Sequence, residues 1–253
     1  MKAIIMAAGK GTRLNDATHP MPKVLREAAG RPLLDFVIND TIPFIGTDDI
    51  TIVVGYMAEH VMARFPNHRF AKQTPDGYGT GFAVKCGISY GGLDDYQGEL
   101  CVLSGDVPLI KRSTVEGMIE LHRRSGAKCT LLSCKSKKPH PFGRIIRDEN
   151  GKLVSIKEHK DCTDEERKID ELNAGCYVFD AEALRVALLK LKNNNAQNEY
   201  YLTDVPLLML QVGEHVEAFV TTDDDELLGV NTFEDLATIE EVLKNRTLNT
   251  MTK

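Results

Sequence analysis

The stretch that decides the fold is residues 2–14, which read KAIIMAAGKGTRL. Its first half, Lys2–Met6, is a short apolar run of the kind that forms a buried β-strand. Glycines follow at once, at Gly9 and Gly11. In an open parallel sheet, ligands bind beyond the carboxyl ends of the strands, and glycines there let backbone N–H groups approach a phosphate. The stretch therefore predicts a parallel α/β sheet with an anion-binding loop, although a plain turn before a helix is the simpler reading of two glycines.

Working outward from this stretch, apolar strand-like runs alternate with helical patterns. The sequence predicts strands over 2–6, 50–54, 99–103, 129–134, 174–179 and 216–220. It predicts helices over 33–44, 57–65, 80–89, 113–124, 181–191, 203–211 and 232–244. This rhythm indicates an α/β protein with a mostly parallel sheet that helices cover on both faces.

The middle of the chain has a different character. Residues 142–147 and 152–157 read as short polar strands around the turn sequence Asp148-Glu149-Asn150-Gly151. The chain shows neither a linker nor an internal repeat. We therefore expect one domain over residues 1–245, with 136–172 as a polar β insertion and 246–253 as a flexible tail.

Composition narrows the classes of function. The chain of 253 residues has a formal net charge of −6, which argues against nonspecific nucleic-acid binding. It has no apolar stretch long enough for a transmembrane helix, and its N-terminus does not resemble a signal peptide. The six cysteines lack C-x-x-C spacing and read mostly as core thiols, which favours a cytoplasmic protein. The acidic run 223–226 reads as a solvated loop.

Spacing excludes two common phosphate-binding motifs at the glycine loop. A dinucleotide fingerprint would require a third glycine where Leu14 stands. A Walker A loop would require a glycine in place of Ile4 and a hydroxyl residue in place of Gly11. What remains is G-x-G-T-R followed by Pro22-Lys23, which places three cations near the loop: Lys10, Arg13 and Lys23. Such a cluster suits a triphosphate together with a second phosphate group, whereas solvated surface cations are the simpler alternative.

These residues, with further motifs along the chain, resemble the sugar nucleotidyltransferases. The motifs occur in the order found in the uridyltransferase domain of bifunctional N-acetylglucosamine-1-phosphate uridyltransferase/glucosamine-1-phosphate acetyltransferases. They include Gly79-Thr80-Gly81, Gly105-Asp106-Val107-Pro108-Leu109, Phe142-Gly143-Arg144-Ile145, Glu158-His159-Lys160-Asp161, Asn173-Ala174-Gly175 and Gly229-Val230-Asn231. The resemblance extends from Lys2 to about Leu243, and it implies a Rossmann-like three-layer αβα sandwich of the nucleotide-diphospho-sugar transferase type.

The resemblance implies that UMP is transferred from UTP to N-acetylglucosamine-1-phosphate. In this reading Arg13 and Lys23 stabilise the phosphates, and Asp106 and Asn231 hold Mg²⁺, an ion that prefers oxygen ligands. Other readings stay open, because Asp106 also suits a turn and Asn231 also suits the cap of the last helix.

The same resemblance implies two substrate-binding sets. The nucleotide set comprises Met6, Ala7, Ala8, Gly9, Gly11, Thr12, Gln73, Gly79, Thr80 and Gly105. The sugar set comprises Gly143, Glu158, Asn173 and Tyr200. Taken one at a time these residues are weak signals, since a glutamine or glutamate outside a motif is usually a solvated surface residue.

The chain also departs from the expected family pattern. Ser104 replaces an aromatic residue, Ala174 replaces a threonine, and the loop 14–22 is longer than expected. Another sugar-1-phosphate or nucleotide, such as glucose-1-phosphate or dTTP, therefore remains an alternative, as does a nonenzymatic nucleotide-sugar sensor. Hexapeptide repeats, which build the acetyltransferase β-helix of this family, are absent from the sequence, so we expect neither acetyl transfer nor trimerisation through such a domain.

Overall fold

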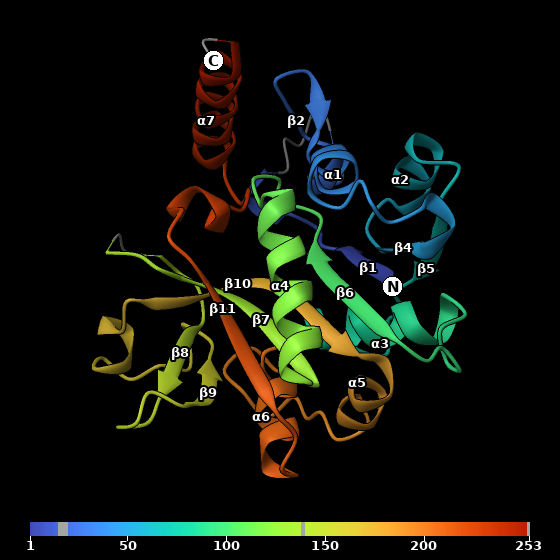
Figure 1. Ribbon diagram of the computed structural model, residues 1–253. Helices are drawn as coiled ribbons and strands as arrows, with labels where there is room; N and C mark the ends of the chain where they lie inside the picture. The colour runs from blue at the N-terminus through green and yellow to red at the C-terminus, as the bar shows by residue number, and fades with distance from the viewer. Residues whose placement is uncertain (15–19, 138–139, 252–253) are drawn as a thin grey trace.

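A twisted nine-stranded sheet forms the centre of the protein (Figure 1). The structure, a computed structural model, describes residues 1–14, 20–137 and 140–251. The main path of the sheet runs β11-β7-β10-β6-β1-β4-β5. These strands are β11 Val216–Thr221, β7 Cys129–Lys135, β10 Glu171–Asp180, β6 Glu99–Ser104, β1 Lys2–Ala7, β4 Ile50–Val54 and β5 Arg69–Lys72. Only β10 in this path runs antiparallel to its neighbours, which confirms the predicted mostly parallel α/β sheet.

Strand β1 is the central element, and its sequence explains why. Ala3 and Ile5 are fully buried in the core on one face of the sheet, and Ile4 is fully buried in the core on the other. Successive side chains of a strand point to opposite faces, so a strand covered on both sides needs a continuous apolar run rather than an alternating one. β1 pairs in parallel with β4 and β6, and the loop after it therefore emerges between two neighbouring strand ends.

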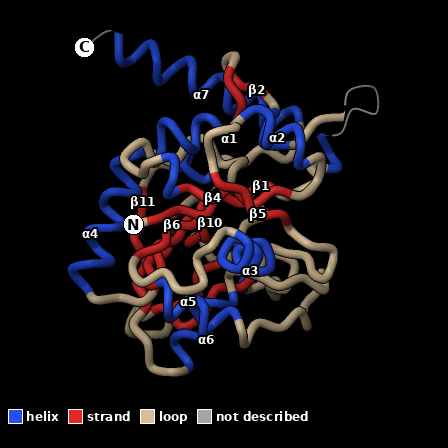
Figure 2. Tube along the Cα trace, turned by 90° about the vertical axis from the view of Figure 1, so that its right-hand side faces the viewer, coloured by secondary structure: helices blue, strands red, loops and turns tan. Residues whose placement is uncertain are grey.

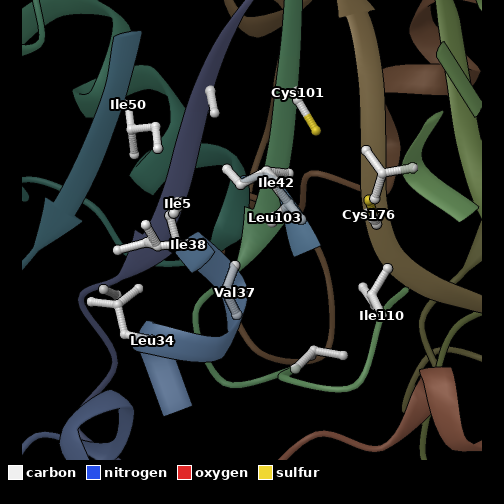
Figure 3. Close-up of a cluster of buried hydrophobic side chains, with 14 of the residues drawn as sticks. Ile5, Leu34, Val37, Ile38, Ile42, Ile50, Cys101, Leu103, Ile110 and Cys176 are labelled. Carbon is white, nitrogen blue, oxygen red and sulfur yellow. The ribbon is translucent and has the colours of Figure 1, made fainter. Parts of the chain in front are cut away.

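Helices cover both faces of the sheet, as the αβα prediction requires. On one face lie α1 Leu33–Phe36, α2 Ala58–Arg64 and α4 Arg112–Ser125. On the other lie α3 Thr80–Tyr90, α5 Ala181–Leu188 and α6 Asp204–Gln211. Figure 2 shows α1 and α2 above the strands and α3, α5 and α6 below them. Figure 3 shows the first of these two cores, where side chains such as Leu34 and Ile38 meet Ile5 from β1.

Several elements differ from the predicted ones. The helix predicted over 33–44 is α1 followed by a π-helical turn, Val37–Thr41, and β5 and the short hairpin β2 Glu27–Ala28/β3 Arg31–Pro32 were not predicted. The last helix, α7 Phe233–Met251, continues well past the predicted end at Lys244. The expected flexible tail over 246–253 is thus helical as far as Met251, and 252–253 lie outside the described residues. One reason is that Arg246 donates a hydrogen bond to the Leu109 carbonyl oxygen at 2.9 Å.

The polar segment in the middle of the chain forms the hairpin β8 Arg144–Arg147/β9 Leu153–Lys157. Its turn closes as the sequence predicts, with Gly151 at φ +78° and the Asp148 carboxylate accepting hydrogen bonds from two backbone N–H groups. β8 also pairs with β10, which attaches the hairpin to the main sheet. The division into one domain over 1–245 with an insertion over 136–172 stays a prediction, and residues 138–139 lie outside the described residues.

The acidic run 223–226 is not the solvated loop that the sequence predicts. Glu226 is 1% exposed, and its carboxylate accepts hydrogen bonds from the hydroxyls of Thr114 and Thr221 and from the Lys111 backbone N–H. Asp223 forms an ion pair with the Lys111 ammonium at 2.6 Å. A buried carboxylate is stable when such donors replace its water, so this run anchors the segment that leads to α7.

The cysteines are buried thiols, as the sequence predicts for most of them. All six cysteines are buried free thiols. Within the described residues, no helix is long and apolar enough to span a membrane.

Candidate active site

The carboxyl ends of β1, β4 and β6 meet at one edge of the sheet. Met6 of β1 is in register with Val53 of β4 and Ser104 of β6, so the loops that follow these strands start side by side. Backbone hydrogen bonds hold the loops together, because the Gly105 N–H donates to the Met6 carbonyl at 2.9 Å. The strand order also reverses between β1 and β6, and an open α/β sheet offers its ligand crevice at such a position.

A cavity of about 750 Å³ opens at this edge. This volume suits a small organic ligand. Residues of the predicted nucleotide and catalytic sets that line it are Met6, Ala7, Ala8, Gly9, Lys23, Gln73, Gly79, Thr80 and Asp106. Gly11, Thr12, Arg13, Gly105 and Asn231 are not among its lining residues, and neither are the predicted sugar residues Gly143, Glu158, Asn173 and Tyr200. The cavity therefore brings together most of the predicted nucleotide set.

Two glycines are required by close contacts around the cavity. Gly11 has φ +57°, and a Cβ atom there would lie 2.8 Å from the Cβ of Lys23. Gly79 has φ +104°, and a Cβ atom there would lie 2.5 Å from the Tyr200 carbonyl oxygen. Side chains are strained at both positive φ values and too close at both positions. Glycine thus lets the first loop approach Lys23, and lets the start of α3 approach the segment around Tyr200.

Three polar side chains from distant parts of the chain converge beside the cavity. The Lys23 ammonium forms an ion pair with Asp106 Oδ2 and donates a hydrogen bond to Asn231 Oδ1 at 3.3 Å. The Lys23 and Asp106 side chains are 16% and 18% exposed, so the pair is largely shielded from water. The Val230 N–H donates to the Asp106 carbonyl at 3.0 Å, which holds the 229–231 segment against the end of β6. Two oxygens from separate segments therefore face one cation.

The structure separates two roles that the sequence left open for the segment before α7. Thr232, not Asn231, caps α7, because its hydroxyl accepts a hydrogen bond from the Asp235 N–H at 3.1 Å. The Asp235 carboxylate in turn accepts from the N–H groups of Asn231 and Thr232, each at 2.8 Å. This reciprocal cap leaves the Asn231 side-chain amide directed at Lys23.

The donor set beside the cavity suits a hard divalent cation. Asp106 and Asn231 supply one carboxylate and one amide oxygen, the ligand types that Mg²⁺ prefers, and Mg²⁺ commonly takes one or two protein ligands together with phosphates. Among the described residues, no group of three or more His, Cys, Asp or Glu is placed to hold a metal. The residues present therefore fit Mg²⁺ shared with a phosphate ligand better than a metal held by protein alone.

Gln73 and Thr80 also line the cavity. Gln73 follows β5, and its side-chain amide N–H donates to the Gly77 carbonyl at 3.3 Å, so its carbonyl oxygen remains available as an acceptor. The Thr80 hydroxyl accepts from the Leu202 N–H at 3.0 Å, which ties the first residue of α3 to the segment after Tyr200. Gln73 thus offers an amide oxygen to the cavity, and Thr80 ties α3 to the neighbouring segment.

Arg13 and Thr12 lie outside the cavity lining. Both are exposed, and Arg13 makes no hydrogen bond or ion pair within the described residues. They belong to a short 3₁₀ turn, Thr12–Leu14, that directly follows the glycine loop. Residues 15–19 of the adjoining loop, whose length departs from the family pattern, lie outside the described residues. The Arg13 guanidinium is accordingly free to meet an anion.

The predicted sugar residues form a second group. The Asn173 N–H donates to the Gly143 carbonyl at 2.9 Å, so these two residues are neighbours across strands. Asn173 is buried, and its side-chain amide donates to the Tyr177 hydroxyl at 2.7 Å. Burial raises the pKa of Glu158, although the Thr203 hydroxyl donates to its carboxylate at 2.9 Å and opposes the shift. Part of the hydrogen-bonding capacity of Asn173 and Glu158 is thus satisfied internally.

Sequence reasoning missed a segment that connects the two groups. The Tyr200 N–H donates to the Tyr78 carbonyl and the Tyr200 carbonyl accepts from the Gly81 N–H, each at 2.8 Å. On the other side, the Asp161 carboxylate accepts from the Ala196 N–H at 3.0 Å. The segment 195–203 therefore joins the lip of the cavity to the insertion, and Glu199 from this segment lines the cavity. Tyr200 was predicted only as a sugar residue, because the partners of this segment lie far away in the chain.

Comparison with known proteins shows the family of the chain. The profile of the nucleotidyl transferase family matches residues 2–245. The chain is 42% identical to the bifunctional protein GlmU of Clostridium novyi over 245 residues, and 41% identical to that of Trichlorobacter lovleyi over 249 residues. Each match covers 96% of this chain and 52% of the relative, so the chain spans about half the length of these relatives.

Solved structures give the same fold at low sequence identity. A nucleoside-diphosphate-sugar pyrophosphorylase from Vibrio cholerae is similar with a TM-score of 0.72 and 16% identity, over 94% of this chain and 99% of that one. A putative glucose-1-phosphate thymidylyltransferase from Bacillus anthracis also gives 0.72, with 19% identity, over 95% of this chain and 94% of that one.

Proposed function

Because the chain belongs to the nucleotidyl transferase family, we propose that it transfers UMP from UTP to N-acetylglucosamine-1-phosphate, giving UDP-N-acetylglucosamine and pyrophosphate. The observation that carries this proposal is the convergence of Lys23, Asp106 and Asn231 beside a cavity at the carboxyl ends of the central strands. A cation next to two cation-binding oxygens serves a reaction between two anions, in which charge must be neutralised before the substrates can meet.

The proposed step is an in-line displacement at phosphorus. An oxygen of the sugar-1-phosphate forms a bond to the α-phosphorus of UTP, and the bond from that phosphorus to the bridging oxygen of the pyrophosphate breaks. The electron pair of this bond leaves with pyrophosphate, so no protein nucleophile is required. Lys23 stabilises the charge that develops on the reacting phosphate, and Arg13 at the end of the glycine loop stabilises the departing pyrophosphate. The backbone N–H groups of the loop 8–11 contribute further donors.

Asp106 and Asn231 would hold Mg²⁺ in this proposal. When bound, the ion supplies neutralisation of phosphate charge and fixes the relative position of the phosphates. The protein's own contribution is to present both oxygens from rigid supports, since Asp106 follows β6 directly and Asn231 precedes the capped start of α7.

Recognition of the two substrates falls to the two groups of residues. Gln73 would pair with uracil through its amide, and Met6, Ala7, Ala8, Gly79 and Thr80 would complete the nucleotide pocket. Glu158, Asn173 and the Gly143 backbone would bind the sugar, and Tyr200 would line its pocket. The Glu158 carboxylate accepts from Thr203, so it is held in place before substrate arrives.

A second candidate keeps the reaction and changes the substrates. Ser104 lines the cavity where the family pattern leads us to expect an aromatic residue, which leaves more room beside Asp106. The similar Bacillus anthracis structure is described as a putative glucose-1-phosphate thymidylyltransferase. Glucose-1-phosphate with dTTP or UTP is therefore the alternative pair to test.

Pyrophosphate release separates these candidates. The purified chain is incubated with UTP, dTTP, ATP, CTP or GTP, each with N-acetylglucosamine-1-phosphate or glucose-1-phosphate, with Mg²⁺ or with EDTA. We expect the fastest release with UTP, N-acetylglucosamine-1-phosphate and Mg²⁺, and none with EDTA. Faster release with glucose-1-phosphate would favour the second candidate. No release from any pair, together with binding of UDP-sugar, would leave only a nonenzymatic sensor.

A further inference from the structure

A second cavity, of about 630 Å³, lies in the insertion and is separate from the candidate active site. We call it the insertion cavity. It lies between the end of β7, the start of β8 and the segment that leads from β9 to β10 (Figure 1). Its lining residues are Ser136, Lys137, His140, Pro141, Arg144, His159, Arg167, Lys168, Ile169, Asp170 and Leu172. None of them belongs to the proposed catalytic, nucleotide, sugar or metal sets.

The insertion cavity lies next to the proposed sugar residues. Arg144 and Leu172 are in register across β8 and β10, and both line the cavity. Their chain neighbours, Gly143 and Asn173, belong to the proposed sugar set and are joined by a backbone hydrogen bond. Neighbouring residues of an extended chain point to opposite sides, so one strand pair separates the two sites.

The charge of the insertion cavity contrasts with that of the whole chain. Four of its lining residues are cationic, Lys137, Arg144, Arg167 and Lys168, and Asp170 is the only carboxylate among them. The chain as a whole has a formal net charge of −6. Arg167 and Lys168 form ion pairs with Asp164 and Glu165 at 2.7 Å, but all four side chains are open to solvent, where such pairs are weak. These two cations can therefore turn to a ligand at little cost.

Arg144 is the unusual member of this group. It is only 4% exposed, and its guanidinium donates to the carbonyl oxygens of Phe142 and Arg167. Within the described part of the chain, no carboxylate forms an ion pair with it. Buried charges in proteins are normally paired, because carbonyl oxygens compensate for lost water only in part. An anion that enters the cavity could therefore pair with this buried arginine.

His159 points to the same conclusion independently. Its Nδ1 atom is buried and has no hydrogen-bond partner. Burial lowers the pKa of His159, and the positive charges of Arg144 and Arg167 lower it further. Buried polar atoms almost always have a partner, so an orphaned ring nitrogen beside two guanidinium groups indicates a site for a ligand that can accept or donate hydrogen bonds.

We propose that the insertion cavity binds a small phosphate-bearing anion through Arg144, Arg167 and His159. Arginine guanidinium groups match the oxygen geometry of a phosphate and bind it through paired hydrogen bonds. The recessed shape and volume favour a small molecule over an extended polyanion such as nucleic acid. The chemistry is shared by inorganic phosphate, pyrophosphate and a phosphate monoester of a sugar.

Calorimetric titration of a catalytic-site variant measures anion binding without any need for catalysis. It therefore tests this proposal independently of the proposed function. The double variant R13A/K23A removes the cations assigned to the active site and so weakens phosphate binding there, and the variants below locate the binding that is left. Inorganic phosphate, pyrophosphate and glucose-6-phosphate are the three probes. We expect at least one of them to bind with a stoichiometry near one, and the tightest of the three identifies the source of the phosphate.

Charge-matched variants then locate the binding. Adding R167A/K168A to the catalytic-site variant should weaken binding at least tenfold, whereas adding R112A/R124A, which removes two exposed arginines of α4, should leave it within twofold. Adding His159→Gln should also weaken binding, without the loss of Arg144 that could disturb folding. Circular dichroism checks that each variant is folded. The absence of binding for all three probes up to about 10 mM, or equal weakening by both pairs, would overturn the proposal.

Discussion

At the scale of single residues, Lys23 decides what the candidate active site can do. Its ammonium contacts both Asp106 and Asn231, and its Cβ lies where only a glycine at position 11 leaves space. Lys23 therefore places a positive charge at the site and also packs against the glycine loop. The ammonium has three N–H donors, so it can contact a phosphate while it still faces Asp106 and Asn231.

We expect Lys23→Ala to reduce turnover roughly 10²–10³-fold while leaving the fold intact. The reason is that the charge on the phosphate in the transition state loses the cation that stabilises it. The fold is retained because the Lys23 side chain is not part of the hydrophobic core. Steady-state pyrophosphate release measures turnover, and circular dichroism measures folding. Lys85→Ala, which removes an exposed cation of α3, is the control. Turnover near that of the unchanged protein would remove Lys23 from the mechanism.

A second prediction at this scale concerns Gly79. Gly79→Ala should cost about 3 kcal/mol of unfolding free energy, because its φ is +104° and the new Cβ would lie 2.5 Å from the Tyr200 carbonyl. Gly92→Ala separates the two causes, since Gly92 has φ +70° but nothing within 4 Å of the new Cβ. It should cost only about 1 kcal/mol. Urea denaturation measures both, and equal costs would show that the contact with Tyr200 is unimportant.

At the scale of elements, the start of α7 supplies a polar side chain to the candidate site and a cap for the helix from adjacent residues. Thr232 and Asp235 satisfy the first N–H groups of the helix. Asn231, one residue earlier, faces Lys23. The helix itself packs over a small core that includes Leu14, Leu33 and Ile239. A helix with both a cap and a core holds its first turn in place, and this fixes the Asn231 backbone.

These two roles should separate on mutation. Thr232→Ala should cost about 1 kcal/mol of unfolding free energy, whereas Asn231→Ala should leave stability nearly unchanged and raise the Mg²⁺ concentration needed for half-maximal turnover. Urea denaturation and a Mg²⁺ titration of pyrophosphate release measure these effects. Thr238→Ala, in the exposed middle of α7, controls for the loss of a threonine. If Asn231→Ala needs no more Mg²⁺ than the unchanged protein, Asn231 does not hold the ion.

At the scale of the whole molecule, one carboxylate joins the insertion to the main sheet. Glu171 of β10 is 5% exposed in its side chain, and it accepts hydrogen bonds from Ser133 of β7 and from Arg147 of β8. Burial raises the pKa of Glu171, but these hydrogen bonds outweigh burial and leave its pKa below the usual value. The position of the proposed sugar residues relative to the sheet therefore depends on this group.

The pH dependence of stability should reveal that connection. A carboxyl group whose pKa is lowered on folding contributes stability above its unfolded pKa, about 4.3 for glutamate, and loses it as pH falls through the folded value. Arg147→Ala should cost about 2 kcal/mol at pH 7, and the cost should fall as the pH is lowered through the depressed pKa of Glu171. Urea denaturation at several pH values measures this. Arg123→Ala, which breaks the more exposed pair with Glu99, should cost less at every pH. An Arg147→Ala cost that does not change with pH would contradict the ion-pair explanation.

The candidate site could be predicted from sequence to the extent that it depends on local patterns. The apolar run before Gly9, the position of Asp106 after a strand, and the motifs with Lys23 and Asn231 are readable because strand ends and turns leave local signatures. The buried role of Glu226 was not readable, because its partners Thr114 and Thr221 reach it only through the fold. The same holds for the segment 195–203 that joins the two halves of the site.

By itself, then, the sequence determined the α/β class, the buried strand over 2–6 and the family resemblance, since each depends on residues close together in the chain. Only the tertiary structure decided which oxygens face Lys23 and that Thr232 rather than Asn231 caps α7. It also decided that a cationic cavity lies next to the proposed sugar residues. The physical reason is that contacts between distant residues follow from strand order and register, which apolar periodicity alone does not specify.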